Sequence, residues 1–273
     1  MFSFRARRAR GYVARMEIAG RKVLLTGASG GLGEAIADDL ARRGAQLVIT
    51  ARREAELAAL AGRTGAEVLV ADLTDRADLD RVLDAARDCD ILIANAGIGA
   101  DVPIEELTAE DVDRSIEVNL RAPILMSTEF VNHRVAQRLP GQVVFIGSLS
   151  GLAPTPMTRM YNATKFGLRG FALSLREDLV GTGVGVSIVE PGFIRDAGMF
   201  ATSGIDLPPG VRTKTPAQVA EGVARAIADD LAEVFVAPFE LRLAATFATV
   251  APALSARIQR RIGTAEMKGA GDR

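Results

Sequence analysis

A glycine-rich segment near the N-terminus, Thr26–Gly33, lies between a short apolar run and a helical pattern. It reads Thr-Gly-Ala-Ser-Gly-Gly-Leu-Gly, after a predicted strand at Lys22–Thr26 and before a predicted helix at Gly33–Arg43. Glycines placed in this way allow a tight turn, a close approach of the backbone to a phosphate, and close helix–strand packing. The segment therefore predicts a parallel α/β fold with a phosphate-binding turn at the start of its first helix.

The rest of the chain alternates short apolar runs with longer helical patterns, which is typical of βαβ units. Residues 143–146 are apolar throughout, as expected for a strand buried on both faces. Helices are predicted at Arg76–Asp88 and from Thr215-Pro216 onward. The pattern predicts a single doubly wound α/β domain of the Rossmann type with a mostly parallel seven-stranded sheet. The predicted strands are Lys22–Thr26, Gln46–Thr50, Glu67–Val70, Ile91–Ala94, Val143–Ile146, Gly185–Glu190 and Val234–Val236.

The two ends of the chain differ from this central region. Residues 1–17 are rich in arginine, and we predict a disordered basic arm or a true translation start at Met16. Residues 18–237 form the predicted cofactor-binding domain, and residues 238–273 a C-terminal amphipathic helical extension interrupted by Pro252. The extension has two interpretations: docking on the domain or on another subunit, or, together with the basic arm, peripheral contact with a membrane surface. Its apolar stripe consists of Phe239, Leu243, Phe247, Val250, Leu254, Ile258 and Ile262.

The composition excludes several classes of function. The net charge of −1 gives no reason to expect nucleic-acid binding. Cys89 and His133 are the only cysteine and histidine, which excludes an intrachain disulfide and a multi-histidine metal site. No apolar run reaches the roughly 18 residues that a membrane-spanning helix needs. We expect a cytoplasmic protein without a metal, in which Cys89 has a packing role.

The end of the second predicted strand indicates which nicotinamide cofactor is bound. NAD-binding proteins place an acid there for the ribose 2′-hydroxyl, but this chain reads Thr-Ala-Arg-Arg at residues 50–53. An arginine at this place, Arg52 or Arg53, pairs well with a 2′-phosphate, and Ser29 adds a donor. The alternative is that both arginines are merely exposed at a helix start. The pattern favours NADP(H) over NAD(H).

A tyrosine and a lysine form a candidate proton-transfer pair. Tyr161 and Lys165 are four residues apart in a helical pattern, which places them on one face of the helix. A phenol has a pKa of about 10, and a neighbouring ammonium favours the phenolate. We therefore expect Lys165 to lower the pKa of Tyr161 toward the range that is useful for acid–base catalysis.

Around this pair the chain resembles the short-chain dehydrogenase/reductase family, in its branch of roughly 250 residues, between Ile18 and Val236. The shared motifs are Thr26-Gly27-x-x-x-Gly31-x-Gly33, Asn95-Ala96-Gly97, the pair Ser148 and Tyr161 separated by twelve residues, then Lys165, and finally Pro191-Gly192. One position departs from the pattern, because Asp196 stands where many relatives have a threonine that binds the nicotinamide carboxamide.

The resemblance implies a role for each matching residue. Tyr161 is the expected general acid, Lys165 its partner at the nicotinamide ribose, Ser148 the group that positions the carbonyl, and Asn119 the holder of a relay water. The structural alternatives are that Asn119 bonds backbone in the sheet, that Ser148 is a turn residue beside Ser150, and that Asp72 caps a helix. The implied cofactor residues are Gly27, Ser29, Gly31, Leu32, Gly33, Arg52, Asp72, Leu73, Asn95, Ala96, Gly97, Tyr161, Lys165, Pro191, Gly192 and Ile194.

These features predict an NAD(P)-dependent oxidoreductase that reduces a hydrophobic ketone or aldehyde, or oxidises the matching alcohol. The predicted substrate loop spans residues 193–212 and includes Met199, Phe200, Ile205 and Leu207; the facing wall contains Leu149, Leu152, Ala153, Pro154 and Met157. By resemblance we expect a homodimer or homotetramer. The alternatives are a nicotinamide-binding sensor or scaffold without turnover, and an epimerase or dehydratase, against which the short C-terminal region argues.

Overall fold

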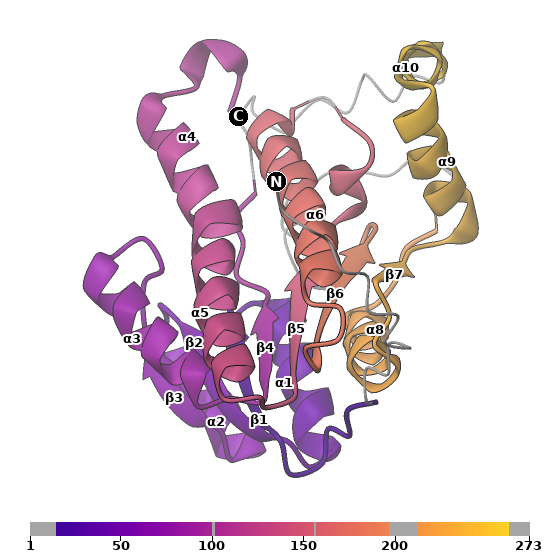
Figure 1. The fold of residues 1–273 in the computed structure, drawn as a ribbon. Coiled ribbons are helices and arrows are strands. Elements are labelled where there is room, and N and C mark those ends of the chain that lie inside the picture. The colour runs from indigo at the N-terminus through magenta and orange to yellow at the C-terminus, as the bar shows by residue number, and fades with distance from the viewer. Residues whose placement is uncertain (1–14, 100–101, 156, 197–211, 262–273) are drawn as a thin grey trace, which may run out of the picture.

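The computed structural model describes residues 15–99, 102–155, 157–196 and 212–261 (Figure 1). Its core is a seven-stranded sheet in the order β3-β2-β1-β4-β5-β6-β7, and every neighbouring pair is parallel. This confirms the predicted Rossmann-type domain, with a sheet that is parallel throughout. The strands are β1 Lys22–Thr26, β2 Gln46–Ala51, β3 Glu67–Val70, β4 Ile91–Ala94, β5 Gly141–Ile146, β6 Val184–Pro191 and β7 Glu233–Val236.

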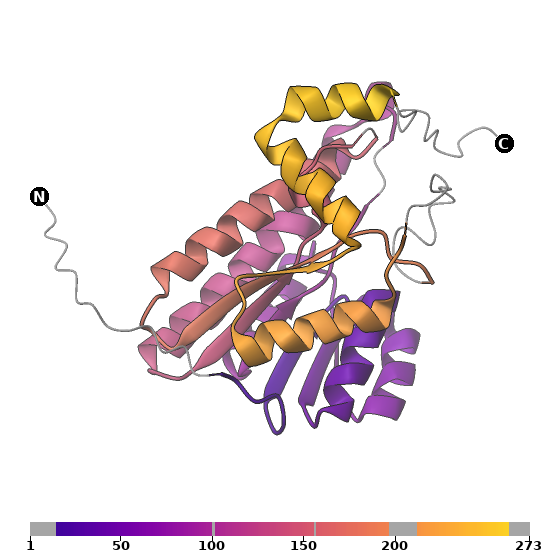
Figure 2. The same ribbon diagram turned by 90° about the vertical axis from the view of Figure 1, so that its right-hand side faces the viewer.

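Helices cover both faces of the sheet (Figures 1 and 2). One layer contains α1 Gly31–Arg42, α2 Glu54–Thr64 and α8 Pro216–Asp229, whose apolar residues join one core cluster. The other contains α3 Arg76–Arg87, α5 Ala122–Ala136 and α6 Arg159–Asp178. Shorter elements are η1 Ile104–Glu106, α4 Ala109–Ile116, the π-helical turn η2 Glu117–Arg121 and the 3-10 turn η3 Leu149–Gly151.

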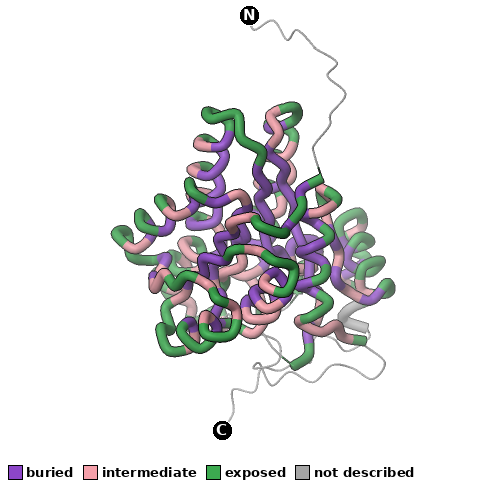
Figure 3. The backbone as a smooth tube through the Cα atoms, turned by 90° about the horizontal axis from the view of Figure 1, so that it is seen from below, coloured by how far each residue is buried: buried purple, intermediate pink, exposed green. Residues whose placement is uncertain are grey.

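The strands are buried because each lies between two helical layers. Val23 and Leu25 face the cluster of α1 and α8, while Leu24 between them faces the cluster of α3 and α5. This alternation explains the continuous apolar runs Val23–Leu25 in β1 and Val143–Ile146 in β5. Figure 3 shows buried backbone concentrated in the centre of the molecule, with exposed segments around it. Cys89 is also fully buried, and burial raises the pKa of its thiol to about 12.

Local sequence signals fix the helix starts. Thr215 and Gln218 form a reciprocal capping box at the start of α8, and Pro216 occupies its first position. Asp75 caps α3 by accepting from the backbone N–H of Asp78. The predicted starts of both helices are therefore confirmed.

The C-terminal extension forms two helices, α9 Phe239–Val250 and α10 Pro252–Arg261, which meet where Pro252 was expected to interrupt the pattern. They stand beside the carboxyl end of the sheet (Figure 2). Thr249 donates a hydrogen bond of 3.2 Å to the carbonyl of Leu152, so α9 is attached to the loop after Ser148. At the other end, Met16 and Ile18 pack into the core. Residues 1–14, and Ile262 of the stripe, lie outside the described residues.

Candidate active site

The glycine-rich turn is packed so closely that side chains are excluded at two positions. Gly27 has φ +65°, and a Cβ added there would lie 2.7 Å from the Cα of Ala96. A Cβ on Gly33 would lie 2.7 Å from the Cα of Ala28. The N-cap of α1, Gly30, provides no side-chain acceptor for the first N–H groups of the helix. The turn therefore offers backbone donors and the positive end of a helix dipole to an anion.

Asn95 fixes this turn to the end of β4. Its amide donates to the carbonyls of Thr26 at 2.9 Å and Gly27 at 3.1 Å. The hydroxyl of Thr26 accepts from the backbone N–H groups of Asn95 and Ala96, both at 3.1 Å. The Asn95 side chain is thus occupied in shaping the turn.

Two arginines follow β2, and the structure gives them different surroundings. Arg53 hydrogen-bonds the carbonyl of Ser29 and lies 3.3 Å from the Ser29 hydroxyl. Arg52 lies 3.8 Å from a carboxylate oxygen of Asp72. Sequence reasoning selected Arg52 for the cofactor site, while the structure places Arg53 against the glycine-rich turn. Arg53 therefore lies where its guanidinium can serve an anionic ligand at the turn, whereas Arg52 lies beside Asp72.

Asp72 has a structural task in addition to its expected place at the cofactor. It accepts from the backbone N–H and the hydroxyl of Thr74 at 2.9 and 2.8 Å. Burial would raise the pKa of this carboxyl, but the bonds from Thr74 and the charge of Arg52 outweigh it, so the pKa is lowered. Asp72 therefore closes a turn before α3, whose capping residue is Asp75.

Ser148, Tyr161 and Lys165 meet at the carboxyl end of β5. The Lys165 ammonium lies 5.6 Å from the centre of the Tyr161 ring and donates to the carbonyl of Ile146 at 2.8 Å. The Ser148 side chain hydrogen-bonds the phenol. Ser148 also accepts from the backbone N–H of Ser150 at 3.1 Å, so it serves the turn as well as the site. The structure thus brings together three of the four predicted catalytic residues around one point.

Asn119, the fourth, lies behind them in the π-helical turn η2. Its side chain accepts from the backbone N–H of Ile98 at 2.7 Å and donates to the carbonyl of Ile98 at 2.8 Å. It is also 3.3 Å from the Thr164 hydroxyl, next to Lys165 on α6. A Cβ on Gly97 would contact Asn119 at 3.3 Å and the Lys165 ammonium at 3.8 Å. Asn119 therefore joins the loop after β4 to the catalytic helix, and it does not bond the sheet.

Burial sets the protonation of the pair. It raises the pKa of Tyr161 to about 12; the hydrogen bond with Ser148 lowers that value and the charge of Glu190 raises it. Burial lowers the pKa of Lys165 to about 8, and Glu190 opposes this. The expected lowering of the Tyr161 pKa by Lys165 is thus not found: loss of solvation is the largest influence on this pKa, and the Lys165 charge is not among the causes of its shift. At neutral pH the site holds a phenol beside an ammonium.

The segment after β6 contains the residues that were expected to border a nicotinamide. Gly192 lies close to β7 and η3, since a Cβ there would be 3.0 Å from the Cβ of Ala237 and 3.3 Å from Leu149. Ile194 is buried and pairs with Lys214 in a single β-bridge. Asp196 adopts φ +71°, is largely exposed, and pairs with Arg195 at 3.3 Å. Nothing in this arrangement aims Asp196 at a carboxamide.

The predicted substrate wall is partly described. Leu152 is buried, Leu149 and Ala153 are half-buried, and Pro154 and Met157 are exposed. Met199, Phe200, Ile205 and Leu207 lie outside the described residues.

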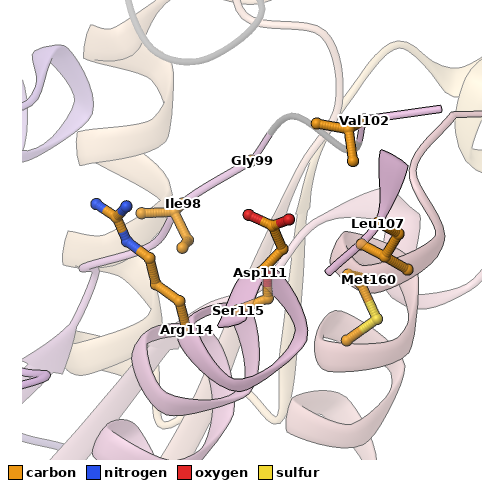
Figure 4. A pocket seen from close by; sticks show the side chains of 8 residues that line it. All are labelled: Ile98, Gly99, Val102, Leu107, Asp111, Arg114, Ser115 and Met160. Atoms are coloured by element: carbon orange, nitrogen blue, oxygen red, sulfur yellow. The ribbon is translucent and has the colours of Figure 1, made fainter. Parts of the chain in front are cut away.

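A cavity of about 230 Å³ is lined in part by Met160, the residue before Tyr161 in the sequence. Figure 4 shows Met160 and Leu107 on one side of this cavity, with Ile98 and Arg114 on the other. The cavity is lined by Ile98, Gly99, Val102, Leu107, Asp111, Arg114, Ser115 and Met160.

Within the described ranges, no cluster of histidine, cysteine or acidic side chains could hold a metal ion. In the same ranges no helix is long and apolar enough to cross a membrane.

A doubly wound sheet with a phosphate-binding turn and a tyrosine–lysine pair defines a nucleotide-dependent oxidoreductase fold. The chain matches the family described as short chain dehydrogenase over residues 21–206, and it belongs to that family. It is therefore an oxidoreductase that binds a nicotinamide cofactor.

Three relatives illustrate the range of the match. The chain is 33% identical to the 3-oxoacyl-[acyl-carrier-protein] reductase of Escherichia coli over 232 residues, covering 80% of this chain and 94% of that protein. A Sphingobium yanoikuyae short-chain dehydrogenase in complex with NADPH has a TM-score of 0.74 and 30% identity, covering 93% and 98% of the two chains. The bulky-bulky ketone specific alcohol dehydrogenase of Comamonas testosteroni has a TM-score of 0.71 and 26% identity, covering 95% and 98%.

Proposed function

We propose that the protein reduces a hydrophobic ketone or aldehyde with NADPH, or oxidises the matching alcohol, with Tyr161 as the general acid or base. The observation that carries the proposal is the Tyr161 phenol, bonded to Ser148 and with its ring centre 5.6 Å from the Lys165 ammonium, in buried surroundings that raise its pKa to about 12. A phenol in this state donates a proton to a carbonyl oxygen as negative charge develops there.

Each residue of the site contributes a separate step. Ser148 orients the carbonyl oxygen toward the phenol, and Tyr161 supplies the proton. Lys165 stabilises the phenolate that remains, and its position beside Gly97 suits a contact with the nicotinamide ribose. Asn119 holds the loop after β4 in place and anchors a proton path that re-protonates the site. The bound cofactor supplies or accepts the hydride.

The chain fits NADPH through its glycine-rich turn and its arginines. The turn has no room for side chains at Gly27 and Gly33 and presents the free N-terminus of α1. Arg53 and Arg52, with the Ser29 hydroxyl, provide cationic donors where an NAD-binding protein has an acid. The relative from Sphingobium yanoikuyae contains NADPH. We therefore propose NADP(H) as the preferred cofactor.

Apolar groups around Tyr161 support a hydrophobic substrate. Leu149 and Leu152 follow Ser148 in the chain, and Met160, the residue before Tyr161, lines the cavity. The relatives include a reductase named for a 3-oxoacyl thioester carrier and a dehydrogenase named for bulky ketones. Both names refer to carbonyl compounds, and the second refers to bulky ketones, which suits an apolar wall.

NADPH oxidation with a panel of ketones and aldehydes tests the proposal, with NADH in parallel. We expect turnover with NADPH and at least one bulky ketone. Tyr161→Phe should abolish turnover while NADPH still binds, because only the proton donor is removed. Turnover that persists in Tyr161→Phe would overturn the mechanism, and NADPH binding without turnover of any carbonyl would favour a sensor.

The exposed stripe on α9 and α10 supports a second proposal, peripheral membrane contact by a cytoplasmic protein. Phe239, Leu243, Val250 and Leu254 are half exposed or more. Co-sedimentation with anionic vesicles tests this against a variant carrying Leu243→Gln, Val250→Gln and Leu254→Gln. Wild type should pellet and the variant should not; equal behaviour would argue against membrane contact.

We further propose a homodimer or homotetramer that assembles through α5 and α6. Phe166 on α6 and Val135 on α5 expose more than a third of their surface. Light scattering after size-exclusion chromatography should give a multiple of the 28.8 kDa chain mass. A monomer at micromolar concentration would contradict the proposal.

A further inference from the structure

A buried acid, Glu190, lies beside the proton-transfer pair and has no role in the mechanism above. It is fully buried at the end of β6, directly before Pro191 and Gly192. Neither of its carboxyl oxygens makes a hydrogen bond with any residue that the structure describes. A carboxylate without partners is costly in a protein interior, so such a group keeps its proton or depends on a nearby cation.

Gly147, the residue before Ser148, provides the space for this side chain. A Cβ on Gly147 would lie 2.8 Å from the carboxyl carbon of Glu190 and would also overlap Oε2. The backbone N–H of Gly147 bonds the carbonyl of Val189 at 2.8 Å, which fixes β5 and β6 in register here. The carboxyl group of Glu190 is therefore packed against the backbone that carries Ser148.

The charged and titratable groups around Glu190 come from two elements. On α6 these are Tyr161, Lys165 and Arg169, and on β7 the group is Glu233. Arg169 lies 4.0 Å from Glu190, but its guanidinium binds both oxygens of Glu233 at 2.7 and 3.2 Å. Its charge is thus largely engaged by Glu233. Lys165 is buried and donates at 2.8 Å to the carbonyl of Ile146, the residue before Gly147, so its ammonium lies on the backbone against which Glu190 packs and its charge acts on that carboxyl.

We propose that Glu190 is a positioning residue whose buried carboxyl, seated against Gly147, keeps Lys165 and Tyr161 protonated and extends the working range of the reductase to alkaline pH. A negative charge next to the pair stabilises the ammonium and destabilises the phenolate, so it opposes the loss of either proton. The proposal rests on the reductase function above, because carbonyl reduction is the direction that needs both protons.

The effect of Glu190 on the protonation of Lys165 depends on the pH at which Glu190 loses its proton. Burial raises the pKa of Glu190 to about 8, while the charges of Lys165 and Arg169 lower it in part. Below that pH the acid is neutral and leaves the lysine undisturbed. Above it, the carboxylate supports the ammonium of Lys165 in the range where that ammonium would otherwise lose its proton.

Infrared spectroscopy of the full-length protein tests the coupling without any substrate. Wild type should show the carbonyl-stretch band of a protonated carboxylic acid at neutral pH, and Glu190→Gln should lack it. Lys165→Met should raise the pH at which the band disappears by about one unit, because the carboxylate loses its cation. A missing band, or an unchanged midpoint in Lys165→Met, would overturn the proposal even if no ketone is ever reduced.

The pH profile of kcat for ketone reduction tests the consequence. Glu190→Gln should match wild type near pH 6, and its alkaline limb should move to lower pH by about one unit. Glu190→Asp keeps the charge and should largely restore that limb. It also serves as the second variant if Glu190→Gln does not fold. An equal loss of rate at every pH, or an unmoved limb, would show that Glu190 is only structural.

Discussion

The glycine-rich turn yields a prediction whose size follows from the geometry of α1. In Gly33→Ala, the new Cβ would lie 2.7 Å from the Cα of Ala28 and 3.0 Å from its carbonyl carbon. It would also overlap the carbonyl oxygen of Gly27. All three atoms belong to backbone, so no rotamer change relieves the contact. To reach an ordinary carbon–carbon contact, α1 must move away from the turn by roughly 0.8 Å.

Overpacking of this kind costs about 1–3 kcal/mol. The helix propensity gained by replacing glycine offsets only about 0.5–1 kcal/mol of that cost. We expect Gly33→Ala to lower the free energy of unfolding by about 1–2 kcal/mol. We also expect weaker NADPH binding, because the displaced helix end carries the phosphate donors. Chemical denaturation followed by circular dichroism measures the first effect, and the fluorescence of bound NADPH, in a chain without tryptophan, measures the second.

Gly62→Ala is the matched control on α2. This glycine is exposed, and an added Cβ there meets nothing within 4 Å. Its replacement should stabilise the protein by about 0.5–1 kcal/mol and leave NADPH binding unchanged. If Gly33→Ala behaved like Gly62→Ala in both assays, the close-packing argument for the turn would be refuted.

Three further predictions concern the cofactor side and pH. Arg53→Gln should weaken NADPH binding roughly tenfold or more, since a charge-assisted bond is worth about 1.5–3 kcal/mol. NADH binding, measured in the same titration, should stay constant. Equal effects on both cofactors would contradict a role of Arg53 at the 2′-phosphate. Asn95→Ala removes the amide that binds two carbonyls of the turn, so it should lower the free energy of unfolding by about 1–3 kcal/mol in chemical denaturation. An unchanged free energy of unfolding would contradict the role of Asn95 in fixing the turn. Burial raises the pKa of Glu190 from 4.5 to about 8, so its stabilisation is complete below the lower value and is lost as pH rises through the upper one. The melting temperature should therefore fall less between pH 5 and about 8 in Glu190→Gln than in wild type, and identical slopes would contradict the raised pKa.

Strands were the most predictable part of the fold because burial on both faces leaves a continuous apolar run. The predicted ranges Lys22–Thr26, Glu67–Val70 and Ile91–Ala94 match β1, β3 and β4 residue for residue. The start of β5 was missed by two residues, because Gly141 and Gln142 are not apolar. Gln142 is nevertheless buried, and its amide donates to the Ser187 hydroxyl on β6 at 2.9 Å. A polar residue satisfied across a sheet gives no signal in hydropathy.

Site residues differ in how far the sequence could place them. Tyr161 and Lys165 were predictable as neighbours because four residues on a helix place them on one face. Asn119 was identifiable only by resemblance, because its contact with Ile98 depends on a π-helical turn that has no period in the sequence. The choice of Arg53 beside Ser29 is likewise a matter of how the chain leaves β2, and residue type cannot separate two adjacent arginines.

The pKa of Tyr161 shows why the chemistry of a site needs its three-dimensional surroundings. Spacing along α6 predicted a charge close to the phenol, and that charge is there at 5.6 Å. Spacing gave no information about solvent, and loss of solvation turned the shift upward. Nor could the spacing along α6 predict Glu190, because this buried acid lies on another strand and packs in the space that Gly147 leaves. Pairs of residues along one helix can thus be predicted from a sequence. Groups that parallel strands bring together can be found only in the fold, and here they set the protonation of the pair.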